Sequence, residues 1–258
     1  MEKTLVLLLG NARGGEDTWN SMYKHLLTPY NADLALCFGE NDNKTSSLYA
    51  KAKFIWEMSE YKNWRDYYEG KFDDNWFKVY EKNAEFGLAG GIDNNIGSGA
   101  IIFAFRDFVL KNYKNILLEY DRIILTRSDY YYIADHPILP IENFYVVEGE
   151  DYDGITDRHH VFNKTMIDDV LGICDYLCSE KHSQELLSIN LNPEISLYKF
   201  FNHNGILQKL QRFKRTQFTV SDVNDTTRWR QGVSPLPGHP SLKIKYYPEY
   251  ETAIKNNK

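Results

Sequence analysis

A β-α-β pattern near the N-terminus constrains the fold of this 258-residue chain more than any other feature. The run TLVLLLG, residues 4–10, is continuously apolar and ends at a glycine, as expected of a parallel strand buried on both faces. Apolar residues then recur at helical spacing over residues 19–27, and ADLALCFG, residues 32–39, predicts a second strand. A helix between two such strands predicts an α/β protein with a right-handed crossover.

The rest of the chain continues this alternation. Residues 44–86 are rich in aromatic side chains and are interpreted as helices without clear boundaries. Further strands are predicted over residues 122–129, 144–149 and 159–163, and helices over residues 100–117, 164–178 and 192–205. Because no linker or repeat divides the sequence, we expect one domain, residues 1–258, around a mixed and mostly parallel central sheet flanked by helices.

Two of the predicted helices carry start signals. Thr165 and Asp168 have the spacing of a capping box, and Asn192 followed by Pro193 is typical of an N-cap and a first helical residue.

Composition excludes some classes of function. A net charge of -6 argues against a general nucleic-acid-binding protein. Residues 199–258 nevertheless contain 11 Lys or Arg against 4 Asp or Glu, so this basic segment could face an anionic small ligand. The N-terminal apolar run is too short for a signal-peptide core or a membrane span. We therefore expect no transmembrane segment and, by default, a cytoplasmic protein.

The first strand ends in the glycine-rich sequence LLLGNARGG. Gly10 lets the backbone approach a ligand closely, Asn11 can bind a base edge or a ribose, and Arg13 can pair with a phosphate. Open α/β sheets bind nucleotides at this position. The segment matches neither the dinucleotide fingerprint nor the phosphate-binding loop with its lysine, so a simple tight turn is the alternative.

A second polar strand end occurs in LTRSDYYY, residues 125–132. Nucleotide-sugar enzymes need carboxylates near a strand end, because a divalent cation bridges the donor diphosphate and neutralises the departing nucleotide. Asp129 lies where such a carboxylate would act, with Arg127 placed to bind phosphate or orient it. The tyrosines at residues 130–132 could stack on a sugar or a base. Alternatively, Asp129 simply ends the strand in a turn.

The acidic run EGEDYDG, residues 148–154, is a competing metal site. Asp151 and Asp153 form a literal Asp-x-Asp, with Glu148 and Glu150 beside them. Loops of this kind are also common as solvated acidic turns.

An enzyme that uses a nucleotide-sugar donor also needs residues that face the acceptor of the sugar. The segments GITDRHHVF and NPE supply the candidates for this role. Asp157 is expected to face the acceptor hydroxyl, as a general base if the reaction inverts or as a stabiliser of the oxocarbenium-like state if it retains. Arg158, His159 and Glu194 are candidate acceptor contacts. The alternatives are a buried histidine ring and a glutamate that favours a helix N-terminus.

The basic segment offers candidates to close over a diphosphate. These are Arg228, Arg230, His239 and Lys243, of which His239 is also a candidate metal ligand.

The segments LLLGNARGG, GSGAIIFAFRDFVLKNY, YDRIILTRSDYYY, GITDRHHVFNK and NPE, taken in order, resemble the GT-A-type glycosyltransferases of chlorella viruses, which are large DNA viruses of algae. The resemblance extends more distantly to bacterial surface-polysaccharide glycosyltransferases and spans about residues 4–205. It implies a GT-A-like domain with a nucleotide-binding half, about residues 1–130, and an acceptor half, about residues 131–258. It also implies a nucleotide-diphosphate sugar donor, first of all a UDP-sugar, a glycan acceptor and a bound Mn²⁺ or Mg²⁺. A viral origin would place the protein in the host cytoplasm.

Carried onto this chain, the resemblance assigns the cation to Asp129. It assigns the base and ribose pocket to Gly10, Asn11, Arg13, Phe38 and Gly39. Arg127 and Ser128 are further candidate donor contacts. The motif departs from the family because Arg127 stands where its first Asp is expected, which leaves open how many carboxylates hold the metal. Two other functions stay open, namely a sugar-phosphate nucleotidylyltransferase and a carbohydrate-binding protein built on a degenerate transferase fold. The sequence leaves the oligomeric state open.

Overall fold

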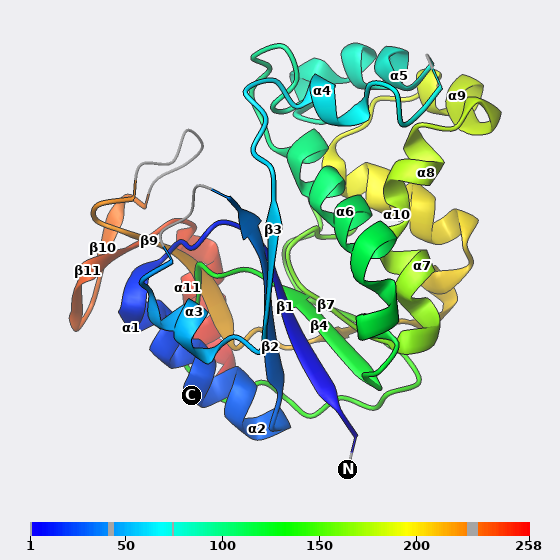
Figure 1. Cartoon of the computed structure of the whole chain (residues 1–258). Coiled ribbons are helices and arrows are strands. Elements are labelled where there is room, and N and C mark those ends of the chain that lie inside the picture. The colour runs from blue at the N-terminus through cyan, green and yellow to red at the C-terminus, as the bar shows by residue number, and fades with distance from the viewer. Residues whose placement is uncertain (1, 41–43, 74, 226–231) are drawn as a thin grey trace.

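A seven-stranded sheet forms the centre of the protein, in the order β3-β2-β1-β4-β7-β6-β8 (Figure 1). The computed structural model describes residues 2–40, 44–73, 75–225 and 232–258. The strands are β1 (Thr4–Gly10), β2 (Asp33–Gly39), β3 (Phe54–Met58), β4 (Arg122–Thr126), β6 (Phe144–Val147), β7 (His160–Asn163) and β8 (Leu210–Phe213). Only β7 runs antiparallel to its neighbours among the described strands of this sheet. The predicted mixed and mostly parallel sheet flanked by helices is confirmed.

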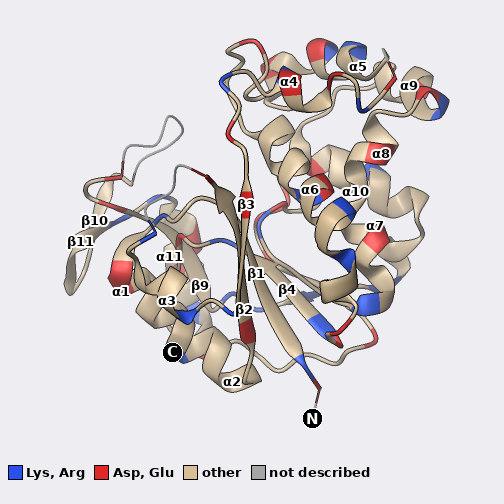
Figure 2. Ribbon diagram, in the orientation of Figure 1, with Lys and Arg blue, Asp and Glu red and all other residues tan. Residues whose placement is uncertain are grey.

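Side chains of β1 alternate between two cores, because helices cover both faces of the sheet. Leu5 and Leu7 pack in the core that contains α6 (Gly99–Leu117), whereas Val6 and Leu8 pack with residues of α1 (Gly15–Met22). Burying one such side chain contributes about 1.5–3 kcal/mol. Figure 2 shows no charged residue on β1, whereas α5 (Trp76–Lys82) and α9 (Glu180–Leu187) carry charges of both signs.

Most of the remaining helices cover the two faces of the sheet, whereas α4 lies beyond its end and α11 packs on β9 (Gln217–Asp222) of the second sheet. Figure 1 shows α6, α7, α8 and α10 on one side and α1, α2 and α3 on the other. Their bounds are α2 (Thr28–Tyr30), α3 (Ser47–Lys51), α4 (Arg65–Tyr68), α7 (Ile167–Leu171), α8 (Ile173–Leu177), α10 (Pro193–His203) and α11 (Tyr247–Asn256). A π-helix, Tyr23–Leu27, continues α1, and short 3-10 helices cover Ala84–Phe86, Lys164–Met166 and Ile206–Lys209. Among the described residues, none of the helices has both the length and the apolar character that a membrane crossing requires.

A second, four-stranded sheet brings the C-terminal part of the chain to the end of β4. It runs β10 (Ser234–Leu236), β11 (His239–Ile244), β9 (Gln217–Asp222) and β5 (Tyr130–Tyr132), with antiparallel pairing throughout its described strands. Because β5 follows β4 after a three-residue turn, both sheets meet at that turn.

Three predicted elements differ from the structure. Residues 44–86 were interpreted as helices, but they contain the edge strand β3. Its side chains are partly exposed, so it lacks the continuous apolar run of a buried strand. The predicted helix over residues 164–178 is interrupted at Gly172, and its cap is Asn163, whose side chain accepts from Thr165 N, instead of the expected capping box. The predicted strand over residues 122–129 ends at Thr126. The start of α10 is as predicted, with Asn192 as N-cap.

Candidate functional site

A pocket of about 1010 Å³ opens at the carboxyl ends of β1 and β4. This edge of an open α/β sheet is where ligands bind. Most of the predicted site residues line it, namely Gly10, Asn11, Arg13, Arg127, Ser128, Asp129, Asp157, Arg158 and Glu194. The structure therefore gathers residues from both halves of the chain into one cavity.

The turns after β1 and β4 are joined by Ser128. Its hydroxyl donates to the carbonyl oxygen of Asn11 at 2.8 Å and accepts from the backbone N–H of Arg13 at 3.0 Å. Gly14 has φ of 87°, and a Cβ there would lie 3.1 Å from Cα of Asp129. Glycine is therefore required where the first turn packs on the second, which fixes the glycine-rich segment against Asp129.

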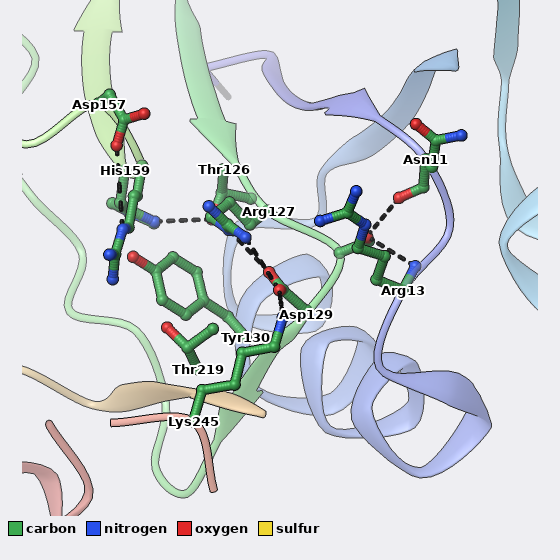
Figure 3. A network of polar contacts seen from close by, with 12 residues as sticks. Asn11, Arg13, Thr126, Arg127, Asp129, Tyr130, Asp157, His159, Thr219 and Lys245 are labelled. Atoms are coloured by element: carbon green, nitrogen blue, oxygen red, sulfur yellow. Dashed lines mark hydrogen bonds and ion pairs between the residues drawn. The ribbon is translucent and has the colours of Figure 1, made fainter. Parts of the chain in front are cut away.

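The carboxylate of Asp129 is bound by two basic side chains. Arg127 donates through Nε and Nη2 at 2.7 and 2.9 Å, and Nζ of Lys245 donates at 2.7 Å (Figure 3). The Asp129 side chain is 2% exposed. Burial alone would raise the pKa of Asp129, but Arg127 and Lys245 outweigh burial and hold that pKa well below its usual range. Asp129 is therefore ionised at neutral pH. We call these three residues the Asp129 cluster.

The residues predicted to hold a divalent cation do not fit that role. Such a cation binds free carboxylate oxygens, and both oxygens of Asp129 already accept hydrogen bonds from cations. His239 is engaged elsewhere, with Nε2 2.7 Å from the Tyr131 hydroxyl and Nδ1 3.3 Å from Asp17 Oδ2. In the described ranges no three His, Cys, Asp or Glu side chains gather as a metal site. The Mn²⁺ or Mg²⁺ expected from the resemblance stays a prediction.

The acidic run after β6 does not supply a cation site either. Asp151 forms an ion pair with Arg212 at 2.8 Å, Asp153 is exposed, and neither residue lines the pocket. The alternative of a solvated acidic turn fits Asp153, whereas Glu150 in the same run is buried. Of the basic candidates, Arg228 and Arg230 lie outside the described residues, and Lys243 does not line the pocket.

A pair of carboxylates, Asp157 and Glu194, lines the pocket away from the glycine-rich turn. Figure 3 shows Asp157 and Asn11 at opposite ends of the polar network. The backbone of Glu194 packs directly on Gly154, where a Cβ atom would clash with it. Glycine at residue 154 therefore lets the segment that carries Glu194 pack close to the segment that precedes Asp157. Burial, together with the neighbouring carboxylate of Asp157, raises the pKa of Glu194 to about 8. Glu194 is therefore mostly protonated at neutral pH and can donate a hydrogen bond.

Two arginines hold the segment that carries Asp157. Arg106 on α6 is fully buried and donates through Nη2 to the Asp157 carbonyl oxygen at 2.8 Å. Arg158 donates to Glu249 on α11 at 2.8 Å. Arg106 was not predicted, although an arginine within the apolar sequence AIIFAFRDF is a usable signal.

The tyrosines after Asp129, which were predicted to stack on a sugar or a base, do not line the pocket. Tyr130 and Tyr132 are buried, and the hydroxyl of Tyr130 donates to the buried carboxylate of Glu150 at 2.7 Å. Glu150 also accepts from Arg215 at 2.8 Å. These aromatic rings therefore form part of the support beneath the pocket.

His159 lies beneath the pocket, so the structure does not place it against an acceptor. Its Nδ1 is 2.8 Å from the Thr126 hydroxyl and its Nε2 is 3.1 Å from Nε2 of His136. His136 Nδ1 faces the Pro137 carbonyl oxygen at 2.9 Å and must donate to it. His136 Nε2 then accepts from His159, and His159 Nδ1 accepts from Thr126. Both rings are neutral and fix the Thr126 hydroxyl at the pocket floor.

The predicted base contacts of β2 are absent from the pocket lining. Phe38 is buried in the core that faces α1, and Gly39 lies against the side chain of Glu60. Glu60 in turn accepts from Asn11 Nδ2 at 3.0 Å. Instead, a second wall that the sequence did not indicate is formed by residues 84–87 and 94–98, including the exposed Ile96.

We expect the buried histidines to destabilise the protein as the pH falls. Burial lowers the pKa of His136 to about 4 and that of His159 well below its usual value. A lowered folded-state pKa gives stability that is complete above the unfolded value of about 6.5 and is lost as the pH falls toward 4. The neutral His136 ring alone should lower the free energy of unfolding by about 2 kcal/mol at pH 5 relative to pH 7. Urea unfolding at the two pH values measures this change. His136→Gln should flatten this slope and the exposed His203→Gln should not. If His136→Gln and His203→Gln lost the same stability between pH 7 and pH 5, the conclusion that the His136 ring is buried and neutral would be wrong.

Comparisons with known proteins give a fold likeness only. No family model matches the chain, and no curated protein sequence matches it. Among solved structures, mouse xyloside xylosyltransferase 1 in its apo form superposes with a TM-score of 0.44 at 12% identity, covering 83% of this chain and 85% of that one. Similarity at this level establishes neither a shared activity nor shared residues.

Proposed function

We propose that this protein transfers a glycosyl group from a nucleoside-diphosphate sugar, first of all a UDP-sugar, to a hydroxyl of a glycan acceptor. The observation that carries the proposal is a single pocket with basic side chains beside the β1 turn and two carboxylates away from it. Basic side chains can bind a diphosphate, and a carboxylate can activate a hydroxyl.

The donor would lie along the carboxyl edge of the sheet. Gly10 and Asn11 bound the nucleoside side, and Arg127 and Lys245 bound the diphosphate side. The sugar would then face Asp157. At about 1010 Å³ the pocket is at the upper end of the range for ligand sites, which leaves room for an acceptor beside the donor.

The transfer forms a bond between the acceptor oxygen and the anomeric carbon. The bond from that carbon to the diphosphate oxygen breaks, and its electron pair stays on the diphosphate. In an inverting reaction Asp157 takes the acceptor proton, and in a retaining reaction it stabilises the oxocarbenium-like state. Protonated Glu194 would donate a hydrogen bond to a sugar oxygen.

The test is a thermal-melt panel of UDP, GDP, TDP and CMP sugars. A ligand at 100 times its Kd stabilises the native state by about 2.7 kcal/mol, which corresponds to a midpoint rise of about 5–10 °C. We expect a UDP-sugar to give this rise and to release UDP slowly by hydrolysis. If no member of the panel shifts the midpoint, the proposal is wrong. Pyrophosphate release with a sugar 1-phosphate would instead show a nucleotidylyltransferase, and binding without turnover a carbohydrate-binding protein.

A further inference from the structure

The Asp129 cluster places two cations around one carboxylate at the pocket. Asp129 and Lys245 are nearly inaccessible, with side chains 2% and 4% exposed, whereas the Arg127 side chain is 29% exposed. All three residues line the pocket. These three residues alone carry one positive charge in excess, although the carboxylate of Asp225 also interacts with Lys245. The accessible surface of the cluster belongs to Arg127.

The cluster has hydrogen-bond donors to spare. Within the part of the chain that the structure describes, Nη1 of Arg127 makes no hydrogen bond, and Nζ of Lys245 makes a single one, to Asp129. Phosphate oxygens accept hydrogen bonds from guanidinium and ammonium groups with favourable charge. A diphosphate in the pocket would meet the exposed guanidinium of Arg127 and the ammonium of Lys245, which also lines the pocket.

Backbone contacts fix Asp129 and Lys245 in place. Val220 N donates to the Asp129 carbonyl oxygen at 2.9 Å, and Lys245 N donates to the Thr219 carbonyl oxygen at 3.0 Å. Strand β9 thus holds Asp129 and Lys245 in one register. Groups fixed in this way need little reorganisation when negative charge develops on a leaving group.

We propose that Arg127 and Lys245, oriented by Asp129, bind the donor diphosphate in the place where a divalent cation was expected. This inference rests on the proposed function and concerns the same site. Asp129 acts here as a positioning residue for two cations. As the bond to the anomeric carbon breaks, its electrons pass to the diphosphate oxygen, and the guanidinium and ammonium groups stabilise that charge without giving up a proton.

The test compares UDP binding by titration calorimetry in excess EDTA and in excess Mn²⁺. We expect similar affinities in the two buffers for the wild-type protein. Lys245→Met should weaken UDP binding about ten- to hundredfold, the range for hydrogen bonds to charged groups, and should weaken UMP binding much less. The matched control is Lys243→Met, which removes a lysine of β11 outside the pocket and should leave UDP affinity unchanged.

The outcomes separate the inference from the function on which it rests. UDP binding that requires Mn²⁺ overturns the inference and leaves the proposed function standing. Lys245→Met binding UDP as tightly as Lys243→Met also overturns the inference. If UDP, GDP and TDP fail to bind in either buffer, the proposed function is overturned and the inference falls with it. The wild-type comparison needs no variant, so a misfolded Lys245→Met leaves the test intact.

Discussion

Asp129→Ala should lower the free energy of unfolding by about 3–5 kcal/mol, the cost of removing one partner from a buried ion pair. The substitution removes the carboxylate that accepts a hydrogen bond from the buried Lys245 ammonium and is the bidentate partner of Arg127. Urea unfolding at pH 7, monitored by circular dichroism, measures the change.

The control for this variant is Asp66→Ala, an exposed aspartate on α4. Surface changes of this kind stay within about 0.5 kcal/mol. Equal stability of the two variants would show that the buried ion pairs contribute little. In that case Asp129 would not hold the two cations in place.

Asp157→Asn should lower the turnover number by about 10²–10⁴-fold, the usual contribution of a general base. The amide keeps the shape of the side chain and loses its ability to take a proton. Because Asp157 lies away from the Asp129 cluster, the melt shift given by the donor should stay nearly unchanged (Figure 3). Initial rates of nucleoside-diphosphate release, together with the melt, separate the two effects.

Asp151→Asn is the matched control, because Asp151 pairs with Arg212 outside the pocket and should leave turnover unaltered. Full activity of Asp157→Asn would remove Asp157 from the chemistry. Glu194→Gln would then be the next variant to measure, since Glu194 lines the same pocket.

The sequence was sufficient to locate the edge of the sheet where the pocket lies. A continuous apolar run that ends in glycine predicts a buried parallel strand, and two such strand ends must meet in space. Gly10, Asn11 and Asp129 could therefore be predicted to lie together, and the structure confirms that they line one pocket. The N-terminus of α10 was equally readable from Asn192 and Pro193.

Long-range pairing hid the rest of the site. Lys245 reaches Asp129 through the antiparallel pairing of β11 with β9. The sequence around Lys245 contains no pattern that predicts this contact. A carboxylate at a strand end looks the same whether it faces a ligand or a distant lysine. His159 was misplaced for a related reason. Its ring is buried against Tyr130, His136 and Phe213, which lie elsewhere in the sequence.

The pairing of β11 with β9 also means that the Asp129 cluster is completed late in the synthesis of the chain. Arg127 follows β4 in synthesis, and Lys245 emerges from the ribosome long after it. Before Lys245 is synthesised, Arg127 is the only one of the two cations of the Asp129 cluster that the chain contains.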